Sequence, residues 1–147
     1  MQTLSCTAFL QNISRLQHTQ NTLARVVAGN HTPCSSLATL SKVHWLPVHD
    51  RIKFKIVTMT HKAIHTGNPQ YLANLVEWHI PCKSLRSASA NFLSVTCCNI
   101  SFGARGFRSA APAIWNSLPS NVRSCKTATT FRRHLKSHLF HSAFATA

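Results

Sequence analysis

The feature that most constrains this chain is its shortage of acidic residues. Its 147 residues include 16 Lys and Arg but only two acids, Asp50 and Glu77, which gives a formal net charge of +14. Two carboxylates cannot neutralise sixteen cations, so most Lys and Arg side chains must face water or a polyanion. Self-repulsion at this charge opposes a compact fold, and bound phosphates would relieve it. Nucleic acid is therefore the first partner to consider, and an anionic membrane surface is the second.

The same shortage excludes several kinds of active site. A two-metal polymerase or nuclease centre needs clustered carboxylates to hold its divalent ions, and two acids are too few. The sequence also has no nucleophile elbow, no Cys-x-x-Cys pair and no Gly-rich phosphate loop. We therefore predict no catalytic residue and no cofactor in this chain.

Histidine and cysteine residues raise the separate question of a metal site. His134, His138 and His141 share one face of a predicted helix, and three imidazoles are sufficient to hold zinc. Because no Cys-x-x-Cys completes a structural site, we interpret these residues as surface histidines and predict no metal. Six widely spaced cysteines without an apolar leader favour reduced thiols over a disulfide framework.

Hydrophobic spacing predicts a mainly α-helical fold. The best-marked helix covers residues 48–65, between Pro47, which suits a first turn, and Gly67, which suits a helix end. Its apolar residues recur at intervals of four, three and four: Ile52, Ile56, Met59 and Ala63. Polar residues occupy much of the remaining surface: Arg51, Lys53, Lys55, His61 and Lys62. We therefore expect a core helix with a basic outer face.

Similar patterns predict the other elements. Further helices are expected over Leu10–Val27, from Ser35 or Ser36 to Lys42, and over Gln70–Trp78, Phe107–Leu118 and Thr130–Phe140. Residues 1–8 are expected to fray, Pro112 to break or start its helix, and residues 92–102 to form at most a short hairpin. The predicted fold is a small, mainly α-helical domain whose buried residues include Trp115, Leu118, Phe131 and Leu135. No run of about 18 apolar residues occurs, so no membrane-spanning helix is expected.

Basic residues concentrate in three stretches, 51–62, 83–108 and 123–136. We predict that they contact phosphates and do not read base sequence. The candidate nucleic-acid-binding residues are Arg51, Lys53, Lys55, Lys62, Arg86, Arg105, Arg108, Arg132, Arg133 and Lys136. The three Trp side chains are interpreted as core anchors, although indole rings can also stack on bases.

Short phrases then connect the chain to a known family. In order, they are His44-Trp45-Leu46-Pro47-Val48, Arg51-Ile52-Lys53-Phe54-Lys55-Ile56, Pro69-Gln70-Tyr71-Leu72, Ser84-Leu85-Arg86-Ser87, Phe107 with Ala110-Ala111-Pro112, Trp115-Asn116-Ser117-Leu118-Pro119 and Phe131-Arg132-Arg133-His134-Leu135-Lys136-Ser137-His138-Leu139-Phe140. This ordered set, which spans nearly the whole chain, resembles the region downstream of the reverse transcriptase core in LINE-type non-LTR retrotransposons. Residues 1–30 resemble the helix that joins this region to the polymerase thumb, and residues 31–147 resemble the basic C-terminal region itself.

The resemblance implies an origin in an RNA-directed DNA polymerase whose catalytic palm and endonuclease would lie upstream. The expected function is a truncated, non-catalytic accessory region that holds RNA or an RNA–DNA hybrid. The missing polymerase domain is a further candidate partner, and the nucleus or cytoplasm is the favoured location. One departure is that Ala104 stands where the family has an acid before Arg105. Two alternatives remain, an inert translated transposon remnant and an organelle-targeted or membrane-surface basic protein.

Overall fold

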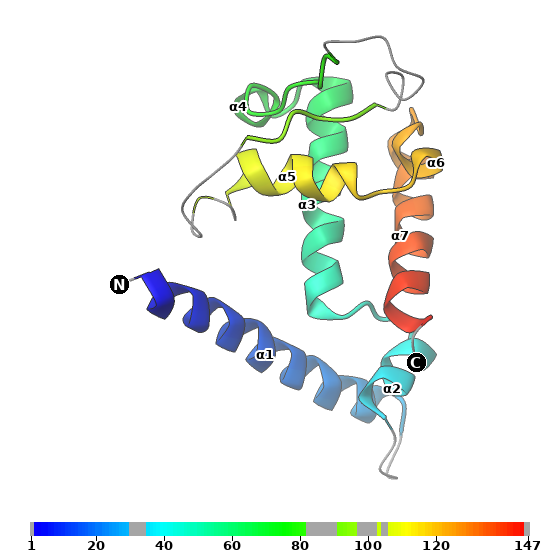
Figure 1. Ribbon diagram of the computed structural model, residues 1–147. Helices are drawn as coiled ribbons and strands as arrows, with labels where there is room; N and C mark the ends of the chain where they lie inside the picture. Colours follow the sequence, from blue (N-terminus) through cyan, green and yellow to red (C-terminus); the bar gives the residue numbers. More distant parts are fainter. Residues whose placement is uncertain (1, 30–34, 82–90, 97–102, 104–105, 146–147) are drawn as a thin grey trace. The chain divides into compact units, whose positions relative to one another are not determined.

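The computed structural model describes residues 2–29, 35–81, 91–96, 103 and 106–145. Within these ranges the chain is mainly helical, has no β-sheet, and has one isolated β-bridge. Its elements are α1 (Gln2–Val27), α2 (Ser36–Lys42), α3 (Val48–Thr66), α4 (Gln70–Ala73), α5 (Phe107–Asn116), α6 (Ser120–Arg123) and α7 (Ala128–Phe144) (Figure 1). The predicted mainly α-helical class is therefore confirmed.

Two compact units make up the chain. One consists of residues 1–52 together with 136–147, and the other of residues 53–135. We refer to them as the terminal unit and the central unit. Helices α3 and α7 each contribute to both, so each unit is described by itself.

In the terminal unit, glutamines of α1 hold the start of α3. The Gln20 Nε2 donates to the Leu46 carbonyl at 2.8 Å, and the Val48 N–H donates to Gln17 Oε1 at 2.9 Å. Val48 is the first residue of α3, where backbone N–H groups have no partner within the helix. The side chain of Gln17 therefore acts as a cap supplied from another helix. Ala24 of α1 and Leu40 of α2 are fully buried in the same unit.

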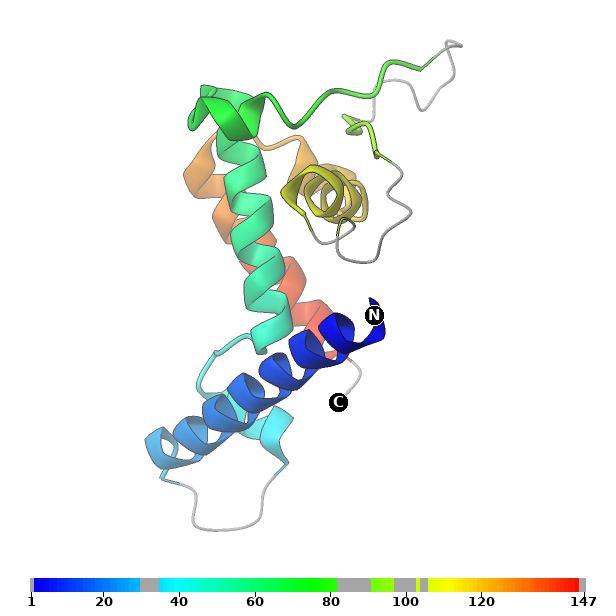
Figure 2. The same ribbon diagram turned by 90° about the vertical axis from the view of Figure 1, so that its left-hand side faces the viewer.

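The core of the central unit is an aromatic stack between α3, α5 and α7. The Phe131 ring stacks on His61 at a centroid distance of 4.1 Å and on Trp115 at 5.7 Å. Because His61 is near the end of α3 and Phe131 near the start of α7, the two helices run antiparallel (Figure 1). Figure 2 shows α5 end-on beside α3. The buried residues of this unit include Val57, Ala63, Leu93, Ala111, Trp115, Leu118, Val122, Phe131 and Leu135.

An extended segment, residues 91–96, completes the central unit. It forms an antiparallel bridge with Trp78, and α5 fixes it from the other side. Asn116 accepts from the Leu93 N–H at 2.8 Å and donates to the Leu93 carbonyl at 2.9 Å. The Trp115 indole N–H donates to the Asn91 carbonyl at 3.0 Å. The Trp115-Asn116 pair of the resemblance therefore has a structural role, which is to attach this segment to the core.

The predictions of individual elements were correct for some helices and wrong for others. The burial of Trp115, Leu118, Phe131 and Leu135 is confirmed. The helix expected over Gln70–Trp78 is wrong beyond Ala73, because Glu77 and His79 pair with residues 92–94 through backbone hydrogen bonds.

Three local predictions also need correction. The first helix begins at Gln2, so residues 2–8 are helical where fraying was expected. Pro112 lies inside α5, where burial of its ring offsets the hydrogen bond that a proline cannot donate. In residues 92–96 the expected hairpin is a single bridge, and residues 97–102 lie outside the described part.

Candidate nucleic-acid interface

The cations of α3 divide between two sides of the helix. Arg51, Lys55 and Lys62 are spaced four and seven residues apart, which keeps them within about 40° of one another around the helix axis. All three are exposed. Lys53 was predicted to share this face, but it lies on the opposite side of the helix and is half-buried. A step of two residues turns a helix by about 200°, so Lys53 cannot share a surface with Lys55.

The cations of α7 are exposed and lie away from its buried stripe. Arg132 and Lys136 are one turn apart, and Arg133 lies about 100° further around the axis. In the central unit, Arg132 is near enough to His61 to lower the pKa of that imidazole. This places Arg132 beside the contact between α7 and α3.

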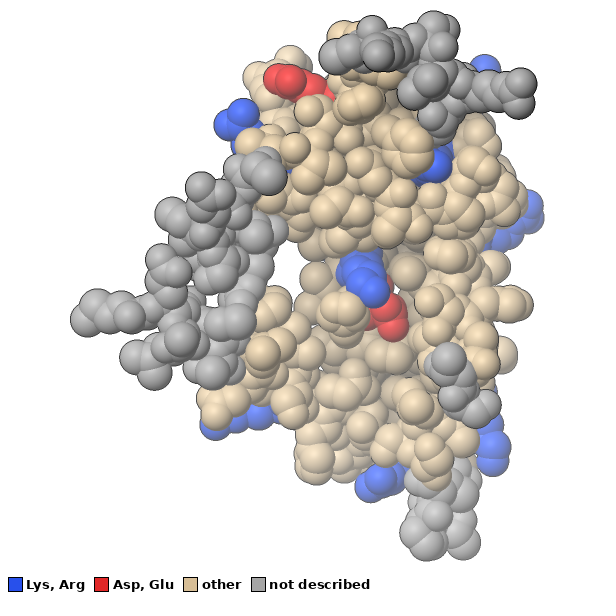
Figure 3. Space-filling view, viewed as in Figure 1, with Lys and Arg blue, Asp and Glu red and all other residues tan. Residues whose placement is uncertain are grey.

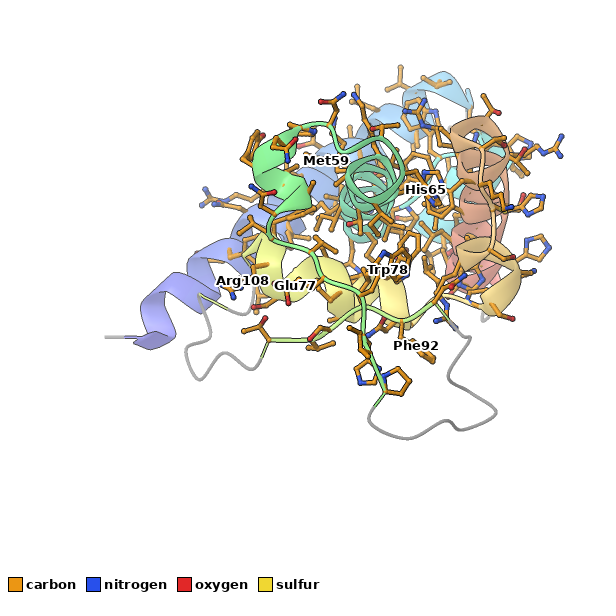
Figure 4. The ribbon with its side chains drawn as sticks, turned by 90° about the horizontal axis from the view of Figure 1, so that it is seen from above. Met59, His65, Glu77, Trp78, Phe92 and Arg108 are labelled. Atoms are coloured by element: carbon orange, nitrogen blue, oxygen red, sulfur yellow. The ribbon has the colours of Figure 1, made fainter. Side chains whose placement is uncertain are left out.

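Four exposed cations of α3 and α7 in the central unit make up what we call the α3–α7 basic face: Lys55, Lys62, Arg132 and Arg133. His65 lies on the side of α3 that is turned toward α7 (Figure 4), and its ring is 4.3 Å from that of His61. The face therefore takes its charge from two helices whose contact is fixed by the buried aromatic stack.

His61 is a correction to the sequence prediction. It was assigned to the basic outer face of the helix, but only 2% of its surface is exposed. Its Nε2–H donates to the Cys125 carbonyl at 2.9 Å. Burial lowers the pKa of His61 below its ordinary value, and His65 and Arg132 lower it further, while the hydrogen bond opposes the shift. The imidazole therefore belongs to the core and not to the outer face of the helix.

The remaining predicted residues are not all brought together. Arg108 is exposed on α5 (Figure 4). Arg86 and Arg105 lie outside the described residues. Arg123, which belongs to the third basic stretch, is buried, and its guanidinium lies 4.1 Å from the centre of the Phe92 ring. Its charge therefore supports the fold through a cation–π contact.

The three tryptophans differ in what they can offer a base. Trp115 is fully buried, so its ring presents no open face, and Trp45 is half-buried. Trp78 is 47% exposed, which contradicts its interpretation as a core anchor. Its neighbour in the bridge, Leu93, takes the buried position. Trp78 is therefore a candidate for stacking on a base, although the sequence pattern predicted that it would be buried.

Among the described residues, no group of three His, Cys, Asp or Glu side chains is arranged to hold a metal ion. His134, one of the three histidines considered for zinc, has its Nδ1 3.6 Å from the Cys125 sulfur. His141 has its Nδ1 2.9 Å from the Ser137 carbonyl oxygen within its own helix. None of the helices in the described ranges has the length and apolar character needed to cross a membrane.

Figure 3 shows a face of the molecule on which neutral residues dominate and Lys and Arg side chains lie singly. On this face the basic residues are therefore scattered, whereas Lys55, Lys62, Arg132 and Arg133 lie on two helices that are in contact. No family model, no curated protein and no solved structure matches the chain.

Proposed function

We propose that the chain is a truncated C-terminal piece of a retrotransposon RNA-directed DNA polymerase, without catalysis of its own, that holds RNA or an RNA–DNA hybrid by its phosphates. The observation that carries the binding activity is the α3–α7 basic face, where exposed cations of two helices flank one rigid contact. The origin rests on the ordered phrases of sequence that resemble the LINE-type family.

Charge balance supports phosphate as the ligand of this face. The whole chain has two carboxylates, and Asp50, one of the two, lies 3.7 Å from the imidazole of His49. Lys and Arg contacts to phosphates release condensed counterions, which favours binding without selecting a base sequence. The buried position of Trp115 and the core role of Arg123 restrict the proposed contacts to outward-facing residues.

The test compares two triple variants that remove the same charge. One replaces Lys55, Lys62 and Arg132 of the basic face by Gln, and the other replaces Arg15, Arg25 and Lys42 of the terminal unit by Gln. All six residues are exposed, so neither set disturbs a core. Affinity for single-stranded RNA is measured over a range of salt concentrations.

The face variant should bind all RNA sequences more weakly, and its salt slope should fall by about 2, because each lost phosphate contact removes roughly 0.7. The terminal variant should change less. Equal losses in the two variants would show that diffuse charge attracts RNA, which would favour the inert-remnant alternative.

A further inference from the structure

Helix α1 carries an apolar surface that the fold of its own unit does not use. Leu16, Leu23 and Val27 are spaced seven and four residues apart and stay within about 40° of one another around the helix axis. Their exposed fractions are 58%, 53% and 63%, and Val26, which widens the same surface, is 74% exposed. We call these four residues the α1 stripe.

The stripe borders the side of α1 that packs within the terminal unit, but its own residues remain exposed. That side is marked by Gln20 and Ala24, which are 6% and 0% exposed, and Gln20 bonds to Leu46. Rotation about the helix axis separates Leu16 from Gln20 by about 40° and from Ala24 by about 80°, so the packed side lies next to the stripe. The apolar stripe is therefore additional to the packed side, and it covers roughly 17 Å of helix from Leu16 to Val27.

The charges of α1 indicate which partner suits the stripe. The helix has no acid, and the first 49 residues of the chain contain none. Arg15 lies at the border of the stripe, and His18 and Arg25 lie on the opposite side of the helix. An apolar stripe with cations at its border and behind it is the pattern of a helix that lies in a membrane interface.

The same charges oppose a second copy of the chain as the occupant. Two copies would bring together two chains with a formal net charge of +14 each, and neither α1 helix would supply an acid to pair with Arg15 or Arg25. An anionic lipid surface provides both negative headgroups and an apolar layer. The long arginine side chain can extend to the headgroups while the leucines enter the layer.

We propose that α1 binds an anionic lipid surface, lying in the plane of the membrane with Leu16, Leu23, Val26 and Val27 in the boundary between headgroups and acyl chains. This binding concerns the terminal unit and does not depend on the RNA contacts of the α3–α7 basic face. It also needs no membrane-spanning segment, since the helix lies along the surface.

The first experiment is flotation of the full chain with vesicles of phosphatidylcholine, with and without phosphatidylglycerol. Replacement of both Leu16 and Leu23 by Ser should weaken binding to the mixed vesicles roughly tenfold or more, because two large apolar side chains no longer enter the layer. The matched control replaces Ile80 and Val95 by Ser, two residues of the central unit that are 86% and 54% exposed. The control should bind as the unaltered chain does.

The second experiment measures which side of α1 faces the lipid, and it does not require a variant that binds more weakly. Tryptophan is introduced in place of Leu16 on the stripe or Ser14 on the opposite side, and its fluorescence is measured with brominated lipids. Trp45, Trp78 and Trp115 give the same background in both variants. Quenching should be stronger for L16W than for S14W.

Several outcomes would overturn the proposal. Equal binding of the stripe variant and the control would mean that charge alone attracts the vesicles, as would equal quenching of the two tryptophans. A stable dimer in solution that only the stripe variant loses would identify a second copy as the occupant. The stripe variant should keep the RNA affinity of the unaltered chain. A test of lipid binding that fails therefore leaves the proposed RNA binding untouched.

Discussion

Single side chains hold the central unit together, and Trp115 and Asn116 are the main examples. Trp115 is fully buried, contacts Phe131 and donates to the Asn91 carbonyl. Its replacement by Ala should lower the free energy of unfolding by about 3–5 kcal/mol, because it leaves a cavity and an unpaired carbonyl. Urea denaturation followed by helical circular dichroism measures this loss. An unchanged midpoint would contradict the burial of Trp115.

Asn116 permits a finer test of the same attachment. Replacement by Ala removes both hydrogen bonds to Leu93 and should cost about 2 kcal/mol. The neighbouring Ser117 is exposed and bonds within its own turn at 2.7 Å, so Ser117→Ala is a matched control with an expected change below about 0.5 kcal/mol. Equal losses of stability in the two variants would mean that the hydrogen bonds between Asn116 and Leu93 do not stabilise the fold.

The buried imidazole of His61 should make stability depend on pH. Burial, His65 and Arg132 lower its pKa in the folded chain, whereas the unfolded chain keeps the ordinary value of 6.5. As pH falls through that value, the unfolded chain gains a proton that the folded chain resists, so stability is lost toward acid. The loss levels off only below the folded pKa.

His61→Phe is the variant that isolates this effect, because Phe can keep the stack on Phe131 but cannot titrate. Free energies of unfolding should be measured for both proteins between about pH 7.5 and pH 5. The unaltered chain should lose stability more steeply than the variant. Parallel curves would mean that His61 is protonated as readily in the folded chain as in the unfolded chain.

At the scale of elements, the turn that leads into α3 depends on α1. The Gln17 side chain accepts from the first N–H of α3, across a separation of 31 residues. Gln17→Ala should cost about 0.5–2 kcal/mol, the usual range for loss of a helix cap. Thr19 is exposed on α1 and bonds only within it, to the Arg15 carbonyl, so Thr19→Ala serves as control. If both variants unfold at the same urea concentration, the cap contributes nothing.

How far the elements could be predicted from the sequence depends on how local their causes are. Helix α3 was predictable from its apolar spacing, Pro47 and Gly67, and α7 from its apolar spacing, because these signals act within a few residues. The end of α4 was not, since the pairing of Trp78 depends on Leu93, which follows fifteen residues later. His61 was misplaced for the same reason, because its Cys125 partner is 64 residues away.

The candidate interface was predictable in composition and less so in arrangement. The sequence identified the basic stretches and assigned Lys55 and Lys62 to the outer face of their helix, where both are exposed. The prediction was wrong for Lys53. Helix geometry places this residue on the side of α3 opposite to Lys55, although both belong to the same basic stretch. The prediction also counted the stretch around Arg123 as an outer surface, whereas the Phe92 ring draws that guanidinium into the core.

For the molecule as a whole, the net charge lowers the stability of the folded state, and this effect belongs to no single contact. Sixteen Lys and Arg residues on a 147-residue chain repel one another, and this repulsion is stronger in the compact state than in the expanded one. Salt screens it over about 8 Å at physiological ionic strength. A polyanion bound to the cations removes it more completely and also favours the folded state by mass action.

We therefore expect the melting temperature to rise when sodium chloride is added to a low-salt buffer, and to rise further with inorganic polyphosphate at the same ionic strength. Matching the ionic strength separates binding from screening. The variant with Lys55, Lys62 and Arg132 replaced by Gln should gain less from polyphosphate than the variant altered at Arg15, Arg25 and Lys42, since only the first set lies on the α3–α7 basic face. If polyphosphate raises the melting temperature no more than sodium chloride does, the cations act as diffuse charge. If both variants gain equally, phosphates bind without using the surface that α3 and α7 build.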